Sequence, residues 1–190
     1  MIGVVVLAAG GSRRLGRAKQ LVVWEGETLL RRAARTALGS ACGPVVVVLG
    51  HRFEEMRREV SGLDVRVVVC EEWEQGMGRS LAWGIRGLVE GEVEGELKAA
   101  IVMTCDQPLV TAGVLNRLIE EWAEGRLVAA CEYAGTVGVP ALFDASLFEE
   151  LMALKGDRGA KGVIRKHGES LGLVQFSGGE IDVDAPGDLP

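Results

Sequence analysis

Short runs rich in valine and isoleucine alternate along this chain with segments whose apolar residues repeat at helical spacing. The runs cover residues 2–7, 45–49, 65–69, 101–104 and 128–131. Such runs are typical of buried parallel strands, and the apolar stripes between them predict amphipathic helices. Strand and helix in alternation predict βαβ crossovers, and therefore a doubly wound α/β sandwich that binds ligands beyond the carboxyl ends of its strands.

Length and charge limit the function classes that need to be considered. With 190 residues, 48% of them hydrophobic, the chain can bury one sizeable core, so we expect a single domain over residues 1–190. The 27 acidic and 21 basic residues give a net charge of −6. That charge opposes general attraction to nucleic-acid phosphates, so no nucleic-acid partner is expected. The first apolar run is too short to span a bilayer and runs into glycines, so no membrane partner is expected either.

The cysteines and histidines do not form a recognisable metal or catalytic motif. The four cysteines lie far apart, without a CxxC pair, at Cys42, Cys70, Cys105 and Cys131. Each lies in or beside an apolar run, which is typical of reduced core thiols in a cytoplasmic protein. Only two histidines are present, and neither has an evident partner for Ser-His-Asp or Cys-His chemistry.

A glycine-rich loop follows the first predicted strand. It reads Leu7-Ala8-Ala9-Gly10-Gly11-Ser12-Arg13-Arg14-Leu15-Gly16, with Lys19 three residues further on. Small residues at the end of a strand let backbone N–H groups wrap phosphate oxygens. The basic residues add local positive charge to an acidic protein. We therefore predict a phosphate-binding loop.

Two common phosphate loops do not match this segment. A Walker A loop requires Lys and Ser or Thr where this chain has Arg17-Ala18. A dinucleotide fingerprint requires spaced glycines and an acidic residue at the end of the second strand, but that strand ends Leu49-Gly50-His51.

The loop does fit the pattern LAAGxSxRxGxxK, which resembles the MobA-like NTP transferase family of glycosyltransferase-A-like nucleotidyltransferases. The resemblance runs from Leu7 to Leu189 and is nearest to the molybdenum cofactor cytidylyltransferase branch. It implies a single-domain, three-layer α/β/α sandwich of the Rossmann-like GT-A type, with a mostly parallel twisted sheet. It also implies an NTP-binding part over about residues 1–110 and an acceptor-binding part over about 111–190. Residues Leu7 to Arg13 and Lys19 would bind the nucleotide, with Arg13 and Lys19 also catalytic.

A second glycine motif, Gly76-Met77-Gly78-Arg79-Ser80, resembles the family's GMGxSL. The resemblance implies that Gly76, Met77, Gly78 and Ser80 contact the nucleotide, since the glycines bring backbone close to the nucleoside. Ser80 could equally serve only as the N-cap of the following helix.

An aspartate leaves the strand over 101–104 in the sequence Cys105-Asp106-Gln107-Pro108. Mg2+ prefers carboxylate oxygens together with phosphates. In the family the matching aspartate binds the metal, so the resemblance implies that Asp106 is a metal ligand and a catalytic residue. The segment over 181–189, which begins Ile181-Asp182-Val183-Asp184, resembles the family's D[IV]DTPEDL, and the match implies Asp184 as the second metal ligand. Alternation places Asp182 and Asp184 on one face, so geometry alone does not choose between them.

The acceptor motifs are less complete. Gly138-Val139-Pro140 resembles the family's GHP, with Val139 where histidine is usual. The segment 155–161 resembles GDxGA[RK], which implies that Asp157 and Lys161 hold an anionic acceptor. The resemblance thus implies Gly138, Pro140, Asp157 and Lys161 as acceptor-binding residues and leaves the identity of the acceptor open.

The implied reaction is Mg2+-dependent attack by a substrate phosphate on the α-phosphorus of an NTP, with release of pyrophosphate. Ala8-Ala9 resembles the branch that transfers CMP from CTP to molybdopterin, whereas the guanylyl branch reads LAGG. The implied partners are CTP, a phosphorylated pterin and, transiently, molybdoenzymes or their chaperones. The alternatives are a guanylyltransferase, a transferase acting on another phosphorylated acceptor, and a non-catalytic carrier of nucleotide or cofactor.

Overall fold

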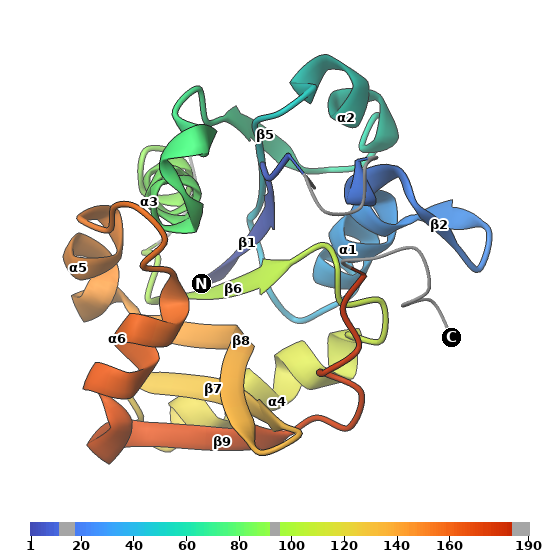
Figure 1. Ribbon diagram of the computed structural model, residues 1–190. Coiled ribbons are helices and arrows are strands. Elements are labelled where there is room, and N and C mark those ends of the chain that lie inside the picture. The colour runs from blue at the N-terminus through green and yellow to red at the C-terminus, as the bar shows by residue number, and fades with distance from the viewer. Residues whose placement is uncertain (12–17, 92–95, 184–190) are drawn as a thin grey trace.

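One seven-stranded sheet forms the middle of the molecule (Figure 1). The computed structural model describes residues 1–11, 18–91 and 96–183. The strands of the sheet lie in the order β5-β4-β1-β6-β8-β7-β9. Their bounds are β1 Ile2–Ala8, β4 Val45–Leu49, β5 Arg66–Val69, β6 Ala99–Thr104, β7 Val128–Tyr133, β8 Thr136–Asp144 and β9 Leu171–Gln175. Each pairing is parallel except the two made by β8, which runs antiparallel to β6 and β7.

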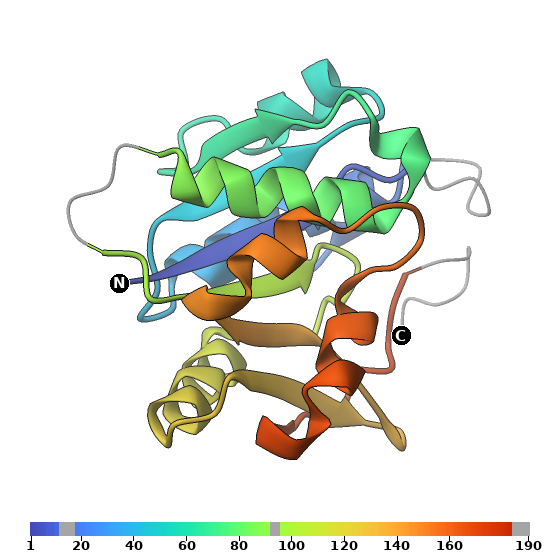
Figure 2. The same cartoon turned by 90° about the vertical axis from the view of Figure 1, so that its left-hand side faces the viewer.

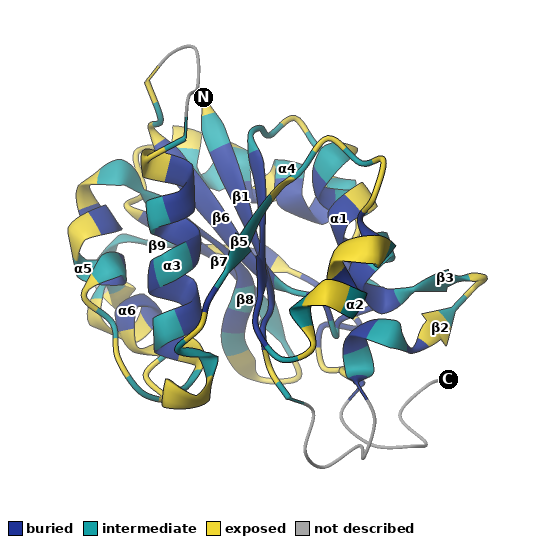
Figure 3. Cartoon of the chain, turned by 90° about the horizontal axis from the view of Figure 1, so that it is seen from above, coloured by how far each residue is buried: buried dark blue, intermediate teal, exposed yellow. Residues whose placement is uncertain are grey.

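Helices cover both faces of this sheet (Figure 3). Helices α1, α2 and α4 lie on one side, and α3, α5 and α6 on the other. Their bounds are α1 Leu29–Leu38, α2 Phe53–Glu59, α3 Met77–Val89, α4 Ala112–Ala123, α5 Phe148–Met152 and α6 Ala160–Lys166. Short 3-10 helices add η1 Lys19–Leu21, η2 Trp73–Gln75, η3 Ala145–Leu147 and η4 Gly168–Ser170, and a small hairpin pairs β2 Val23–Trp24 with β3 Glu27–Thr28.

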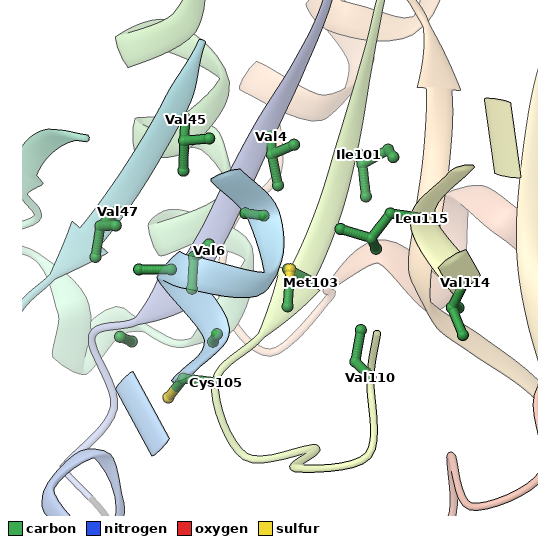
Figure 4. Close-up of a cluster of buried hydrophobic side chains, with 14 of the residues drawn as sticks. Val4, Val6, Val45, Val47, Ile101, Met103, Cys105, Val110, Val114 and Leu115 are labelled. Atoms are coloured by element: carbon green, nitrogen blue, oxygen red, sulfur yellow. The ribbon is translucent and has the colours of Figure 1, made fainter. Parts of the chain in front are cut away.

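The alternation of side chains along β1 builds both halves of the core. Val4 and Val6 face α1 and α4, whereas Val5 and Leu7 face α3, α5 and α6. Figure 4 shows the first of these layers, where valines of β1 and β4 share one cluster with β6 and Leu115 of α4 lies beside Ile101 and Met103. Full burial of a side chain of this size stabilises the folded state by about 1.5–3 kcal/mol relative to exposure to water. A strand covered on both faces therefore needs the continuous apolar run that the sequence shows.

The predicted fold class is confirmed. The sheet is mostly parallel and lies between two helical layers, as the view in Figure 2 also shows. Four of the five predicted strand segments lie within strands of the sheet, and the fifth, over 65–69, begins one residue before β5. Helix α2 was not predicted, because Met56 is its only buried residue and no apolar stripe exists in the sequence.

The run over 128–131 was predicted as a buried parallel strand, and β7 does pair in parallel with β9. Its antiparallel pairing with β8, which lies between β6 and β7, was not predicted. Two residues with positive φ, Ala134 (45°) and Gly135 (72°), join β7 to β8. A two-residue turn of this kind closes a hairpin and imposes antiparallel pairing. Ala-Gly is not one of the common hairpin pairs, so no clear turn signal marks this hairpin in the sequence.

No helix within the described ranges is long and apolar enough to cross a membrane.

Candidate active site

The predicted phosphate loop leaves the carboxyl end of β1, in the middle of the sheet. Ala9, Gly10 and Gly11 follow β1, and Ala18 directly precedes η1. Ser12 and Arg13, which were predicted to bind phosphate, lie outside the described residues. Their roles therefore stay predictions.

A cavity of about 330 Å³ opens over this loop. It brings together residues of the loop, of η1, of the second glycine motif and of the turn after β6. It is lined by Leu7, Ala8, Ala9, Gly10, Gly11, Lys19, Gln20, Trp73, Glu74, Gly76, Met77, Ser80, Thr104, Cys105, Asp106 and Asp157. Ten of the predicted nucleotide or catalytic residues thus line one cavity, and Asp157, predicted for the acceptor, lines it too.

A second cavity of about 400 Å³ adjoins the first. Its wall comes mainly from β6, β7, β8, the start of α6 and the segment over 179–182. It is lined by Leu7, Met77, Thr104, Asp106, Gln107, Tyr133, Val139, Asp157, Gly159, Ala160, Lys161, Gly179, Glu180 and Asp182. Since Asp106 lines both cavities, one carboxylate faces two places where a substrate can lie.

Asp106 and Lys19 form an ion pair at this junction. The Nζ of Lys19 donates to Oδ2 of Asp106, and the two side chains are 19% and 13% exposed. The backbone beneath Asp106 is held on two sides, because Cys105 N donates to Leu7 O (3.3 Å) and Val183 N donates to Asp106 O (3.0 Å). A partly buried carboxylate that already holds one cation has the chemistry required of a divalent metal ligand.

The segment before Asp184 runs beside Asp106. Val183 is 1% exposed and packs with Val22 and Leu29, whereas the exposed Asp182 lines the second cavity. The predicted alternation therefore holds for these two residues. Asp184 itself lies outside the described residues, and the part of the chain that is described holds no cluster of three or more His, Cys, Asp or Glu suited to a metal.

The second glycine motif packs backbone to backbone against the loop over 155–159. Gly78 N donates to Gly156 O (2.9 Å). A β-carbon on Gly78 would lie 2.5 Å from Arg158 O, and one on Gly76 would lie 2.5 Å from Gly156 O. Gly76 also has φ of +105°, which disfavours any other residue. The motif thus joins the wall of the first cavity to the loop that carries Asp157, a residue that lines both cavities.

We expect Gly78→Ala to destabilise the protein, although alanine is the better helix former. The gain in helix propensity is about 1 kcal/mol, but the contact with Arg158 O cannot be relieved without moving backbone. The net effect should be a loss of about 1–3 kcal/mol in the free energy of unfolding, measured by urea denaturation. Gly162→Ala in α6 is the matched control, since a β-carbon there meets nothing within 4 Å; if both variants have the same stability, the packing argument is wrong.

Ser80 is not a helix cap. Helix α3 begins at Met77 and its N-cap is Gly76, which places Ser80 one turn inside the helix. Ser80 is buried and lines the first cavity, and its hydroxyl forms a hydrogen bond with the side chain of Cys70. Of the two predicted roles, the capping role is therefore wrong, and the nucleotide contact stays a prediction.

The predicted acceptor residues separate into two groups. Asp157 and Lys161 line the second cavity. Gly138 and Pro140 lie in β8 and are buried, and neither lines the cavities. Val139, between them, does face the second cavity. A β-carbon on Gly138 would lie 2.7 Å from Oη of Tyr133, so this glycine makes room for a side chain of the cavity wall.

The sequence did not predict the polar groups at the back of the second cavity. Nε2 of the buried Gln107 donates to Gly179 O (2.8 Å), and Tyr133 Oη donates to Val139 O (3.0 Å). Burial raises the pKa of Tyr133 above its usual value, so this hydroxyl remains a neutral donor. Only the CDQP motif pointed toward Gln107, and no motif pointed toward Tyr133.

The cysteines are thiols of the protein interior, as predicted. Cys70, Cys105 and Cys131 are buried, and Cys42 is half-buried. Burial raises the pKa of both Cys105 and Cys131 to about 12. Cys105 lines the first cavity, but as a protonated thiol it is a poor nucleophile.

The arrangement of a glycine loop, a lysine and a carboxylate between two cavities places the protein among the Rossmann-like α/β nucleotidyltransferases. A family model described as "MobA-like NTP transferase domain" matches residues 4–171. The chain therefore belongs to the MobA-like NTP transferase family, as its motifs predicted.

Two curated relatives align over almost the whole chain. "Nicotine blue oxidoreductase" of Paenarthrobacter nicotinovorans is 31% identical over 182 residues, which cover 91% of this chain and 86% of the relative. "Purine catabolism protein PucB" of Bacillus subtilis (strain 168) is 30% identical over 198 residues, covering 98% of this chain and 92% of the relative. The two names indicate different biological settings, so they support the family and not one substrate.

Solved structures agree with the fold over nearly the whole chain. Rv0371c from Mycobacterium tuberculosis H37Rv has a TM-score of 0.84 at 30% identity, covering 98% of this chain and 94% of that one. Its complex with manganese has a TM-score of 0.78 at 27% identity, covering 98% and 95%. A nucleotidyl transferase from Methanothermobacter thermautotroptrophicus has a TM-score of 0.81 at 25% identity, covering 99% and 94%.

Proposed function

We propose that this nucleotidyltransferase transfers CMP from CTP to the phosphate of molybdopterin or of the molybdenum cofactor, with release of pyrophosphate. The observation that carries the proposal is the place of Asp106, which faces both cavities and is paired with Lys19. In-line transfer requires a nucleotide and an acceptor to meet at one centre where charge is neutralised. The junction of the two cavities provides such a centre.

The first cavity is the nucleotide site in this proposal. Backbone N–H groups over Ala9 to Ser12 hold phosphate oxygens, and Lys19 together with Arg13 neutralises their charge. The residues of the second glycine motif contact the nucleoside. Most of the lining comes from residues 1–110, which form the NTP-binding part.

A divalent cation, Mg2+ in our proposal, would be held by Asp106 and Asp184. The donor chemistry of Asp106 supports this assignment, and the chain places Asp184 directly after Val183, whose N–H is bonded to the carbonyl of Asp106. The manganese complex of the mycobacterial neighbour supports a divalent metal in this family. When bound, the cation offsets the negative charge of the triphosphate.

The second cavity is the acceptor site, built mainly by residues 111–190. The ammonium of Lys161 attracts the acceptor phosphate, and Gly138 and Pro140 support the wall that carries Val139. The attacking phosphate is already ionised at neutral pH, so the reaction requires no general base. Positioning and charge neutralisation supply most of the catalysis.

CTP is the favoured nucleotide because Ala8, which ends β1, and Ala9, which follows it, line the first cavity and match the Ala-Ala pair of the cytidylyl branch. We expect calorimetric titration in Mg2+ to give tighter binding of CTP than of GTP, ATP or UTP. Preferential binding of GTP would replace the cytidylyl assignment with a guanylyl one. Titration without the metal is the control, and it should give weaker binding of every triphosphate.

A pyrophosphate-release assay with CTP and molybdopterin tests the reaction itself. Release that requires both substrates supports the transferase, and the product should contain CMP joined to the pterin phosphate. Binding of CTP without any release would favour a carrier. Release with a different phosphorylated acceptor, and none with molybdopterin, would keep the chemistry and change the substrate.

A further inference from the structure

Gln20 lies directly beneath the phosphate loop and is almost fully buried, with 1% of its surface exposed. Its amide nitrogen donates to two backbone carbonyls of the loop, Ala8 O at 2.8 Å and Gly10 O at 2.7 Å. The adjacent residue in η1, Lys19, reaches Asp106. The short helix η1 therefore supplies both the lysine that pairs with Asp106 and the amide that is hydrogen-bonded to the loop.

The carbonyl between these two is also held. His51 N donates to Ala9 O at 3.1 Å. The carbonyls of Ala8, Ala9 and Gly10 thus accept hydrogen bonds from protein donors on neighbouring segments. These peptide bonds are trans, so each carbonyl points opposite to the N–H of the next residue. Fixing the three carbonyls fixes the directions of the N–H groups of Ala9, Gly10 and Gly11.

This orientation matters because a carbonyl oxygen and a phosphate oxygen repel each other. A loop that can rotate its peptide planes can present either an oxygen or an N–H to the ligand, and only the second arrangement binds an anion. A glycine-rich loop has unusual freedom to rotate. A buried amide that is hydrogen-bonded to two carbonyls of the loop removes that freedom before the nucleotide binds. Binding then costs less conformational entropy.

We infer that Gln20 is a positioning residue for the triphosphate, acting through the carbonyls of Ala8 and Gly10. The inference rests on the proposed nucleotide-binding function of this loop. Glutamine suits the task because its NH2 group provides two donors. Glutamate has the same shape, but its ionised carboxylate offers only acceptors and would repel both carbonyls.

The test compares Gln20→Met with the unchanged protein in titrations with CTP, inorganic tripolyphosphate and cytidine. Methionine keeps the length and volume of the side chain without its donors. We expect affinity for CTP and for tripolyphosphate to fall about tenfold, as for the loss of two buried hydrogen bonds, while affinity for cytidine changes less than about twofold. A role confined to folding would lower the affinity for all three ligands alike, or for none of them. A loss of affinity restricted to the two phosphate-containing ligands is therefore the decisive readout.

Gln175→Met is the matched control. Gln175 also bonds through its side-chain amide, to Glu132, but on the edge strand β9 and away from both cavities, so its variant should bind all three ligands normally. If Gln20→Met melts too low for titration, Gln20→Glu, which preserves the shape, carries the comparison and should lose phosphate affinity at least as strongly. Normal CTP binding by the folded Gln20 variants overturns the inference and leaves the proposed function standing. Failure of the unchanged protein to bind any triphosphate overturns both.

Discussion

Replacement of Asp106 by asparagine is expected to lower the rate of nucleotidyl transfer by about two to three orders of magnitude. Loss of one group that stabilises charge at a reaction centre costs this much in other enzymes, and Asp106 is the carboxylate that lines both cavities and also pairs with Lys19. The amide keeps the size of the side chain but not its charge, so the fold should stay intact. Turnover is measured as pyrophosphate release, and folding as a thermal melt.

Asp106→Ala should abolish turnover in the same way, with the same fold. Asp64→Asn provides the control for a change of aspartate charge, since Asp64 is exposed and lines neither of the two cavities. It should leave turnover unchanged. Normal turnover of Asp106→Asn in Mg2+ would mean that the metal site has been assigned to the wrong carboxylate.

Replacement of Lys19 by methionine is expected to lower turnover by about two orders of magnitude and yet to tighten the binding of Mn2+ in the absence of nucleotide. The first effect follows from the loss of the ammonium that, in the proposed function, neutralises the triphosphate. The second follows from the ion pair, because Lys19 holds the carboxylate that a metal would bind and repels any cation that approaches it. Electron paramagnetic resonance of Mn2+ measures the second effect directly, and we expect at least about a threefold gain in affinity.

These two effects separate a catalytic role from damage to the fold. A misfolded variant would lose turnover and metal binding together, whereas Lys19→Met should lose one and gain the other. Lys98→Met is the control, because Lys98 is exposed and lies just before β6, at the opposite end of the strand from Asp106. Weaker binding of Mn2+ by Lys19→Met would show that Lys19 does not compete with the metal for Asp106.

Predictions of where candidate site residues lie were most accurate when the motif that marks them is contained in a short stretch of chain. The loop after β1 and the aspartate after β6 were placed correctly, because a glycine or a carboxylate at a strand end needs only local pattern to be found. The capping role of Ser80 was wrong because the helix begins three residues earlier, at Met77. The boundary of a helix depends on packing of its first turn, and here that turn packs against the loop over 155–159.

Gln20 shows why other parts of the site were missed. In the sequence it is one polar residue between Lys19 and Leu21, without a pattern that marks it as buried. Only the folded chain brings its amide to the carbonyls of Ala8 and Gly10. Tyr133 and Gln107 were missed for the same reason, since their partners lie on other segments.

The sequence by itself determined the family, the alternation of strands and helices, and the position of the glycine loop after β1. Each of these depends on residue types at short, regular spacing, which records the 2.0 and 3.6 residue periods of strand and helix. Tertiary structure alone decided that β8 lies between β6 and β7, that Lys19 meets an aspartate 87 residues away, and that two cavities share that aspartate. Contacts between distant segments depend on how strands are ordered and helices packed, and no local spacing specifies that order.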